Sequence, residues 1–218
     1  MQIKVVRKIL EANDRISDQL KTLFQEKKIL VINLMSSPGA GKTTLLEKTL
    51  SQLKEEFSMA VIEGDLQTSN DAERVAATGA QAIQINTEGG CHLDGSMVFE
   101  AASQLDLKNV DILFVENVGN LVCPAEFSVG EDHKVTILSV VEGDDKPEKY
   151  PLIFAESSVL LLNKMDLLPH VDFSLEKASN FARSLRDDIQ IFSVSARTME
   201  GMEDWYKWLR KEVELKKK

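Results

Sequence analysis

The stretch Ser36-Ser37-Pro38-Gly39-Ala40-Gly41-Lys42-Thr43-Thr44 decides the fold of this chain. An apolar run at residues 29–35 precedes it, and a run with helical character at residues 45–53 follows it. A strand, a glycine-rich turn and a helix in this order are the setting in which proteins bind phosphate groups. We therefore predict that the stretch is a phosphate-binding loop around which the rest of the chain is built.

The residue types in this loop suit the phosphates of a nucleotide. Gly39 and Gly41 let the backbone approach an anion closely, so that successive N–H groups point at phosphate oxygens. Lys42 can reach the β- and γ-phosphates, and the Thr43 hydroxyl can hold Mg²⁺. Ser36 stands where the usual pattern has glycine, and it preserves the loop if its φ stays negative. The predicted nucleotide-binding residues here are Pro38, Gly39, Ala40, Gly41, Lys42, Thr43 and Thr44.

The composition of the whole chain excludes several classes of function. With 218 residues, 43% hydrophobic and 28% charged, the chain is expected to form one globular domain over residues 1–218. The net charge of −9 argues against a nucleic-acid-binding surface. No apolar run approaches the ~20 residues that span a bilayer, and two cysteines are too few for a disulfide framework. We expect a cytoplasmic protein that binds neither nucleic acid nor a membrane.

Hydrophobic periodicity predicts the other elements. An amphipathic helix is expected at residues 3–26. The expected strands are residues 59–62, 81–85, 111–115, 135–141, 159–162 and 189–194, and the expected helices are residues 72–77, 93–105, 147–155, 174–186 and 201–215. This alternation predicts an α/β fold: a three-layer P-loop NTPase with a mostly parallel twisted sheet flanked by helices.

Acidic residues follow two of the predicted strands, at the edge where a parallel sheet binds its ligands. Asp65 is a candidate Mg²⁺ or water-positioning residue, and Asp71 is either another Mg²⁺ ligand in a switch or only a helix cap. Glu116 closes a buried strand and Gly119 comes three residues later. This pattern resembles a loop in which the glycine amide senses the γ-phosphate and the carboxylate orients Mg²⁺.

The sequence Asn163-Lys164-Met165-Asp166 directly follows a predicted strand and indicates guanine selection. A carboxylate at Asp166 can accept two N–H bonds from guanine, which adenine cannot offer. Asn163 can bond N7 or brace the phosphate-binding loop, and the stem of Lys164 can cover the base. After the last predicted strand, Ser195 and Ala196 complete the predicted site, since the Ala196 N–H could bond guanine O6.

Three soft ligands lie beyond two strand ends. Cys91 and His92 follow one predicted strand and Cys123 follows the next, so the two loops can meet if those strands are adjacent in the sheet. Two thiolates and an imidazole suit Zn²⁺ or Ni²⁺, and a two-fold dimer could complete the coordination. Two ordinary buried cysteines with a surface histidine, or a disulfide, are the alternatives. His133 and His170 are expected to be solvated loop residues without a ligand partner.

Four segments of the chain, residues 36–46, 91–94, 116–124 and 163–167, resemble the HypB family of GTPases. These segments include Cys-His-Leu-Asp and Glu-Asn-Val-Gly-Asn-Leu-Val-Cys-Pro, and the resemblance extends over nearly the whole chain. The family takes part in nickel insertion during maturation of nickel–iron hydrogenases. The urease accessory GTPase UreG is a close cousin, but its corresponding loop lacks the second of these segments.

The resemblance implies a single GTPase (G) domain whose metal site is formed by Cys91, His92 and Cys123. The site would lie at or near a nucleotide-dependent homodimer interface. Other hydrogenase maturation proteins and the hydrogenase large subunit would be the partners. Many family members add an N-terminal cysteine motif or histidine-rich tract, which this sequence does not show. Some carry a further histidine where this chain has Gly95, Ser96 and Met97.

The expected activity is slow hydrolysis of GTP to GDP, coupled to nickel delivery. The residues expected to carry hydrolysis are Lys42, Thr43, Asp65, Glu116 and Gly119, with Mg²⁺ held by Thr43 and by Asp65, Asp71 or Glu116. No arginine or glutamine can be assigned from sequence as the group that completes the transition state. The alternatives are a urease-type nickel accessory GTPase, a P-loop ATPase, and a metallochaperone that binds nucleotide with little turnover.

Overall fold

The computed structural model describes residues 2–65 and 74–218, and it places the side chains of residues 10–64 and 74–218. The described strands form one seven-stranded sheet in the order β3-β2-β4-β1-β5-β6-β7, and every neighbouring pair is parallel. The strands are β1 (Leu30–Ser36), β2 (Met59–Asp65), β3 (Gln81–Asn86), β4 (Ile112–Glu116), β5 (His133–Ser139), β6 (Val159–Asn163) and β7 (Gln190–Ser193). Because β1 lies between β4 and β5, the strand order reverses there, and ligands bind at such a switch point.

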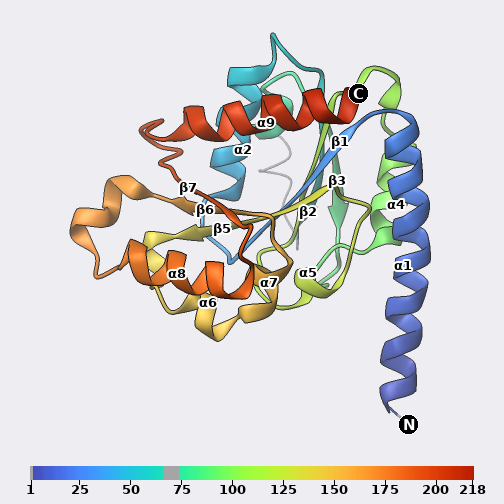
Figure 1. Cartoon of the computed structure of the whole chain (residues 1–218). Coiled ribbons are helices and arrows are strands. Elements are labelled where there is room, and N and C mark those ends of the chain that lie inside the picture. Colours follow the sequence, from blue (N-terminus) through green and yellow to red (C-terminus); the bar gives the residue numbers. More distant parts are fainter. Residues whose placement is uncertain (1, 66–73) are drawn as a thin grey trace.

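Helices cover both faces of this sheet, which makes the three predicted layers (Figure 1). α2 (Lys42–Leu53) and α9 (Met202–Lys217) pack on one face with the even-numbered residues of β1, including Ile32. α1 (Gln2–Glu26) and α4 (Gly95–Ser103) cover part of the opposite face. The rest of that face is covered by α5 (Cys123–Glu126), α7 (Pro151–Glu156) and α8 (Leu175–Leu185). α6 (Lys146–Lys149) lies beside α7.

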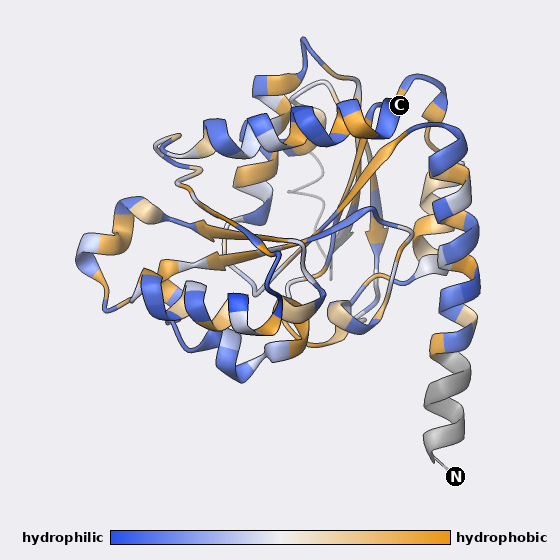
Figure 2. Ribbon diagram, in the orientation of Figure 1, coloured by the Kyte–Doolittle hydropathy of each residue, from blue (hydrophilic) through white to orange (hydrophobic). Residues whose placement is uncertain are grey.

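The central strands are buried on both faces, as parallel strands between helical layers must be. All seven residues of β1 and all five of β4 and of β6 are buried. Figure 2 shows these strands as mostly hydrophobic and the helices as a mixture of hydrophobic and hydrophilic residues. The amphipathic helix predicted at the N-terminus is confirmed in α1, whose Leu20 and Phe24 are fully buried against the sheet.

Two predicted boundaries are wrong for local reasons. The predicted strand at 135–141 ends instead at Ser139, whose side chain and that of Glu142 form a capping box that starts a short 3-10 helix. The single helix predicted at 147–155 is divided at Tyr150, because Pro151 lacks an N–H and disfavours helical backbone before it. Residues 74–76 are helical, while the start of the helix predicted at 72–77 lies outside the described residues.

All strands of this parallel sheet open their carboxyl ends on one edge, so every loop that the sequence singled out leaves the sheet on the same side. None of the helices in the described part of the chain is long and apolar enough to span a membrane.

Candidate functional site

The phosphate-binding loop leaves β1 and enters α2 with two glycines in the left-handed region. Gly39 has a φ of 75° and Gly41 a φ of 99°. A Cβ on Gly41 would lie 2.6 Å from the Asn163 Nδ2 atom, so a side chain there would displace the end of β6. In the described part of the chain, the residues other than glycine with positive φ are Lys28, Glu88, Lys164 and Met199. Ser36 is not one of them, so the condition for a serine at its position is met.

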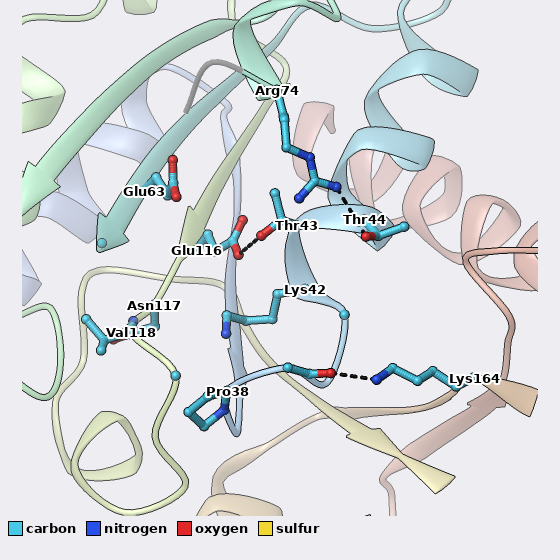
Figure 3. Close-up of a pocket in the computed structure, with 14 residues that line it drawn as sticks. Pro38, Lys42, Thr43, Thr44, Glu63, Arg74, Glu116, Asn117, Val118 and Lys164 are labelled. Carbon is cyan, nitrogen blue, oxygen red and sulfur yellow. Dashed lines mark hydrogen bonds between the residues drawn. The ribbon is translucent and has the colours of Figure 1, made fainter. Parts of the chain in front are cut away.

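Lys42 is the first residue of α2, and its ammonium reaches back to the end of β1. The Nζ atom donates to Ser36 Oγ at 3.0 Å, and that hydroxyl donates to Ser37 O at 2.6 Å. The serine that replaces glycine is therefore a direct contact of the predicted phosphate-binding lysine. Since Ser36 is buried and Lys42 lines the cavity above the loop, this contact positions the ammonium at the phosphate site (Figure 3).

A cavity of about 490 Å³ lies over the loop and has acidic residues at one side. Thr43 Oγ1 donates to Glu116 Oε1 at 2.8 Å, and both residues are buried. Glu63 on β2 is the register partner of Glu116 on β4, and the two carboxyl groups lie near each other in Figure 3. Two carboxylates and a hydroxyl are the hard oxygen ligands that Mg²⁺ prefers. The donor set of this cavity therefore fits a magnesium nucleotide.

Two of the predicted Mg²⁺ residues fall where the structure gives no side-chain description. The backbone of Asp65 ends β2, but its side chain lies outside the described residues, as does all of Asp71. Glu63 lines the cavity instead, a residue that the sequence reasoning passed over in favour of Asp65. The sequence did contain an indication of this role, because Glu63 is a charged residue near the carboxyl end of an otherwise apolar strand.

Arg74 is a second lining residue that sequence reasoning did not select. Its guanidinium donates to Glu47 Oε1 at 3.1 Å and Oε2 at 2.6 Å, and to Thr44 Oγ1 at 3.3 Å. An arginine at the wall of a phosphate cavity can stabilise charge on phosphate oxygens. The sequence offers no local motif around Arg74 that would have selected it, since its position depends on its contacts with Thr44 and Glu47 of α2.

A second cavity, of about 280 Å³, adjoins the first and shares Gly41, Thr44 and Lys164 with it. The loops after β6 and β7 form its other wall, with Asn163, Lys164, Asp166, Leu167, Ala196 and Arg197. The predicted base-binding residues therefore come together beside the phosphate site. Ser195 supports them from behind, since its Oγ donates to Asp166 Oδ1 at 2.6 Å and orients that carboxylate.

The structure also shows how this second cavity is attached to the phosphate-binding loop. Asn163 Nδ2 donates to Ala40 O at 2.9 Å, which is the bracing role among the two predicted for Asn163. Lys164 Nζ donates to Gly39 O at 2.6 Å. The Ala196 N–H, predicted as a donor to the base, donates to Asn163 Oδ1 at 3.2 Å. Phosphate and base walls thus form one hydrogen-bonded unit.

Cys91, His92 and Cys123 come together as predicted. Within the described residues they form a group whose ligand atoms all lie within 4.8 Å of one another, about twice a metal–ligand bond of 2.0–2.3 Å. Cys91 Sγ lies 2.9 Å from Cys123 Sγ and 3.5 Å from His92 Nδ1, and both cysteines are free thiols. We call these three residues the metal triad. Its donor set and spacing fit one Zn²⁺ or Ni²⁺ ion with a coordination position left open.

The route by which the two loops meet differs from the prediction. The strands before them, β3 and β4, are not adjacent, because β2 lies between them. The loop after β3 crosses this gap with Leu93, which is fully buried against Gly64 of β2; a Cβ on Gly64 would lie only 2.7 Å from Leu93 Cγ. The triad therefore depends on a glycine in the intervening strand.

Neighbouring side chains tune and hold the triad. His92 stacks on Phe127 with ring centroids 3.9 Å apart, and Asn120 Nδ2 donates to Cys91 O at 3.2 Å. Burial lowers the pKa of His92, partly offset by the nearby carboxylates of Asp94 and Glu126, which favours the neutral imidazole that binds metals. The hydrogen-bonded Cys91 thiol and burial raise the pKa of Cys123. Metal binding is therefore expected to release thiol protons.

The prediction for His133 is wrong, whereas His170 is exposed as expected. His133 begins β5 at the opposite edge of the sheet, where its Nδ1 lies 3.0 Å from Ser158 Oγ and its Nε2 lies 3.4 Å from Glu212 Oε2. Its ring also packs edge-on against Trp208. Packing of α9 on the sheet brings these partners together, and no pattern local to His133 indicates it.

Comparisons with known proteins agree on one family. The family model CobW/HypB/UreG, nucleotide-binding domain, matches residues 30–193. The hydrogenase maturation factor HypB of Escherichia coli (strain K12) is 54% identical over 201 residues, which cover 92% of this chain and 69% of that protein. A crystal structure of HypB from Helicobacter pylori in complex with nickel has a TM-score of 0.89 at 37% identity, over 93% of this chain and 95% of that chain. A crystal structure of the hydrogenase maturation factor HypB from Archaeoglobus fulgidus has a TM-score of 0.87 at 33% identity, over 93% of this chain and 99% of that chain.

Proposed function

The chain belongs to the CobW/HypB/UreG family and, within it, to the HypB hydrogenase maturation factors, and from this membership we propose a metal-delivering GTPase. GTP binding and hydrolysis are coupled to the delivery of nickel during maturation of nickel–iron hydrogenase. The observation that carries the proposal is one short connection. The residues from Glu116 in the phosphate cavity to Cys123 in the metal triad are a single loop after β4.

Hydrolysis uses the groups that line the phosphate cavity. Lys42 stabilises negative charge on the β- and γ-phosphates, and Gly119 offers its amide to the γ-phosphate while a water attacks in line. Thr43 and Glu116 would hold Mg²⁺, with Glu63 beside them and Asp65 and Asp71 as further candidates. Bound Mg²⁺ supplies neutralising charge for the phosphate oxygens. Among the described residues that line this cavity, Arg74 is the arginine, and its guanidinium adds positive charge there.

Guanine is selected by Asp166 in the smaller cavity. Its carboxylate is held by Ser195 and accepts the two N–H donors of guanine, while the stem of Lys164 covers the base. Adenine lacks that donor pair, so its binding would leave the carboxylate without hydrogen-bond donors from the base.

The metal triad carries Ni²⁺ as cargo, and Zn²⁺ is a second ion that its donor set accepts. Three ligands leave the coordination open, so a second copy of the chain can complete the site in a two-fold dimer that forms with GTP. The ligands must be thiolates and not a disulfide, which suits the reducing cytoplasm, and both cysteines are free. The partners are other hydrogenase maturation proteins and the hydrogenase large subunit.

Nucleotide and metal sites should influence each other, because Cys123 lies four residues after Gly119. When Gly119 engages the γ-phosphate, the backbone that carries Cys123 shifts relative to Cys91 and His92. A tetrahedral site tolerates little change in ligand distances, so metal affinity differs between the GTP and GDP states. By linkage, bound metal changes nucleotide affinity by the same free energy.

The test is a titration of the GDP and non-hydrolysable GTP forms with nickel and with zinc, with molecular mass measured in parallel. Different metal affinities and a larger mass with the GTP analogue are expected. Equal affinities together with one unchanged mass would contradict the coupling. Steady-state GTP hydrolysis, measured on the same samples, separates the proposed enzyme from a metal-binding scaffold with little turnover.

A further inference from the structure

Asn117, the residue directly after β4, contacts three parts of the molecule with one buried carboxamide. Its side chain is 1% exposed. The Oδ1 atom accepts from the backbone N–H groups of Leu93 and Val118, each at 3.0 Å. The Nδ2 atom donates to Asn33 Oδ1 at 3.3 Å. Since nothing in sequence reasoning required more than a connecting residue here, this set of contacts calls for an explanation.

Each contact leads to a functional segment. Leu93 directly follows His92, so its N–H belongs to the loop that carries Cys91 and His92. Val118 precedes Gly119, which lies so close to Pro38 that a Cβ on Gly119 would be 3.0 Å from three Pro38 atoms. The third contact, through Asn33, reaches β1, the strand that leads into the phosphate-binding loop.

The covalent backbone connects the phosphate cavity to only one part of the metal triad. A movement of Gly119 reaches Cys123 through the covalent backbone. Cys91 and His92 come from β3, which β2 separates from β4, so they must be reached through non-covalent contacts. Asn117 provides one directly from the wall of the phosphate cavity to the residue after His92.

We propose that Asn117 is the positioning residue that transmits γ-phosphate occupancy to Cys91 and His92. The inference rests on the proposed coupling of nucleotide to metal and assigns the residue that carries it. A single Oδ1 atom holds both N–H groups, so movement of the Val118–Gly119 backbone must either pull the Leu93 backbone with it or break a buried hydrogen bond. A buried unpaired N–H is costly, so the two segments move together.

Asn13 on α1 is a matched control. Its Oδ1 accepts the N–H of Gly95 at 2.7 Å, only two residues beyond Leu93, and its Nδ2 donates to Ser128 O at 2.9 Å. It is also buried, at 5% exposure. Loss of Asn13 therefore weakens the same segment by the same kind of bond, but Asn13 does not line the phosphate cavity.

The experiment compares Asn117→Ala, Asn13→Ala and the unmutated chain. Each is titrated with Zn²⁺ in the GDP form and in the form bound to a non-hydrolysable GTP analogue. In the unmutated chain the two Zn²⁺ dissociation constants should differ by roughly 5- to 150-fold, the usual range of coupling between sites. Asn117→Ala should reduce this ratio by at least about threefold, because the backbone route to Cys123 and the Asn120–Cys91 hydrogen bond remain, whereas Asn13→Ala should keep it even if both affinities fall.

A retained ratio in folded Asn117→Ala overturns the assignment of Asn117 and leaves the proposed function standing. A ratio of one in the unmutated chain overturns both. Equal loss of the ratio in both variants also overturns the assignment, because it indicates a general loosening of the loop.

Amide hydrogen exchange in the unmutated chain keeps the inference testable should Asn117→Ala fail to fold. When the GTP analogue replaces GDP, the protection of the Leu93 and Val118 amides against hydrogen exchange should change together. The protection of the Gly95 amide, which is hydrogen-bonded to Asn13, should stay the same. A change at Val118 without a change at Leu93 overturns the proposal.

Discussion

The guanine cavity and the metal triad both lie on loops at the carboxyl edge of the sheet, yet the chain supports them differently. In the guanine cavity, Asn163 and Lys164 are hydrogen-bonded to the phosphate-binding loop, and Asp166 is held by Ser195. In the metal triad, Cys91 Sγ lies 2.9 Å from Cys123 Sγ and 3.5 Å from His92 Nδ1, so the ligand atoms contact one another across two separate loops, and Cys91 is exposed.

This difference follows from what each site has to do. A base-binding site gains selectivity when its polar groups are already oriented, because little order is lost on binding. A metal site that must release its ion gains from ligands on separate loops whose spacing can change. The contrast leads us to expect a rigid nucleotide site and an adjustable metal site in one chain. Four variants test this contrast, and the variant with the strongest expected change in activity comes first.

Lys42→Ala should separate the two sites most strongly. The variant loses the ammonium that stabilises charge on the transferred phosphate, so GTP turnover should fall by about 10²–10³-fold or more, with weakened GTP binding. The metal triad does not contact Lys42, so zinc affinity without nucleotide should be unchanged. Steady-state phosphate release and a zinc titration measure the two effects, and near-normal turnover would remove Lys42 from the mechanism.

Cys123→Ala should have the opposite pattern. Removal of one of three ligands should cost more than the roughly 10–100-fold in metal affinity that is usual for residues that only support a ligand. The phosphate-binding loop is untouched, so GTP should still bind. Metal and nucleotide titrations of the same preparation check this, and a variant that still bound nickel as tightly as the unmutated chain would show that Cys123 is not a ligand.

Asp166→Asn should change the choice of base with no loss of the metal site. Mismatched buried hydrogen bonds cost about 1–3 kcal/mol, so GTP affinity should fall by roughly 5–150-fold. Affinity for xanthosine nucleotides should rise, because their 2-oxo group accepts from the new amide. Competition binding among GTP, XTP and ATP is the measurement. If ATP competes equally with GTP for the unmutated chain, guanine selection by Asp166 is wrong.

His133 should affect stability alone, since it lies at the edge of the sheet opposite both sites. Burial holds its pKa below the ordinary value of 6.5, partly offset by Glu212, so the unfolded chain binds this proton more readily than the folded chain. The contribution of the neutral His133 to the free energy of unfolding is therefore fully present above pH 6.5. It is lost as the pH falls through that value toward the lower pKa of the folded chain.

A comparison of the unmutated chain with His133→Gln isolates the pH-dependent stability that comes from His133, because the other titrating groups are common to both proteins. Denaturant unfolding between pH 7.5 and 5 should show a smaller loss of stability in the variant. Zinc affinity and GTP binding at pH 7.5 should be the same in the two proteins. A steeper loss in the variant would mean that the Glu212 contact, and not burial, dominates.

Local patterns were sufficient for much of this molecule. The phosphate-binding loop is recognisable because its function requires glycines, a lysine and a hydroxyl at fixed spacing between a strand and a helix. The strands at residues 111–115 and 159–162 could be predicted because continuous apolar runs of that length fit a sheet covered on both faces. The Asn163–Asp166 motif is equally local, since all its groups extend from one strand end.

The relations between segments far apart in the sequence depend on the three-dimensional fold. The order of the strands places β2 between β3 and β4, aligns Glu63 with Glu116, and brings Arg74 to the phosphate cavity. The contacts of Asn117 depend on the same arrangement. Strand order and register are set by the packing of whole apolar faces and helices, to which each segment contributes only part, so they cannot be inferred from any one stretch of sequence.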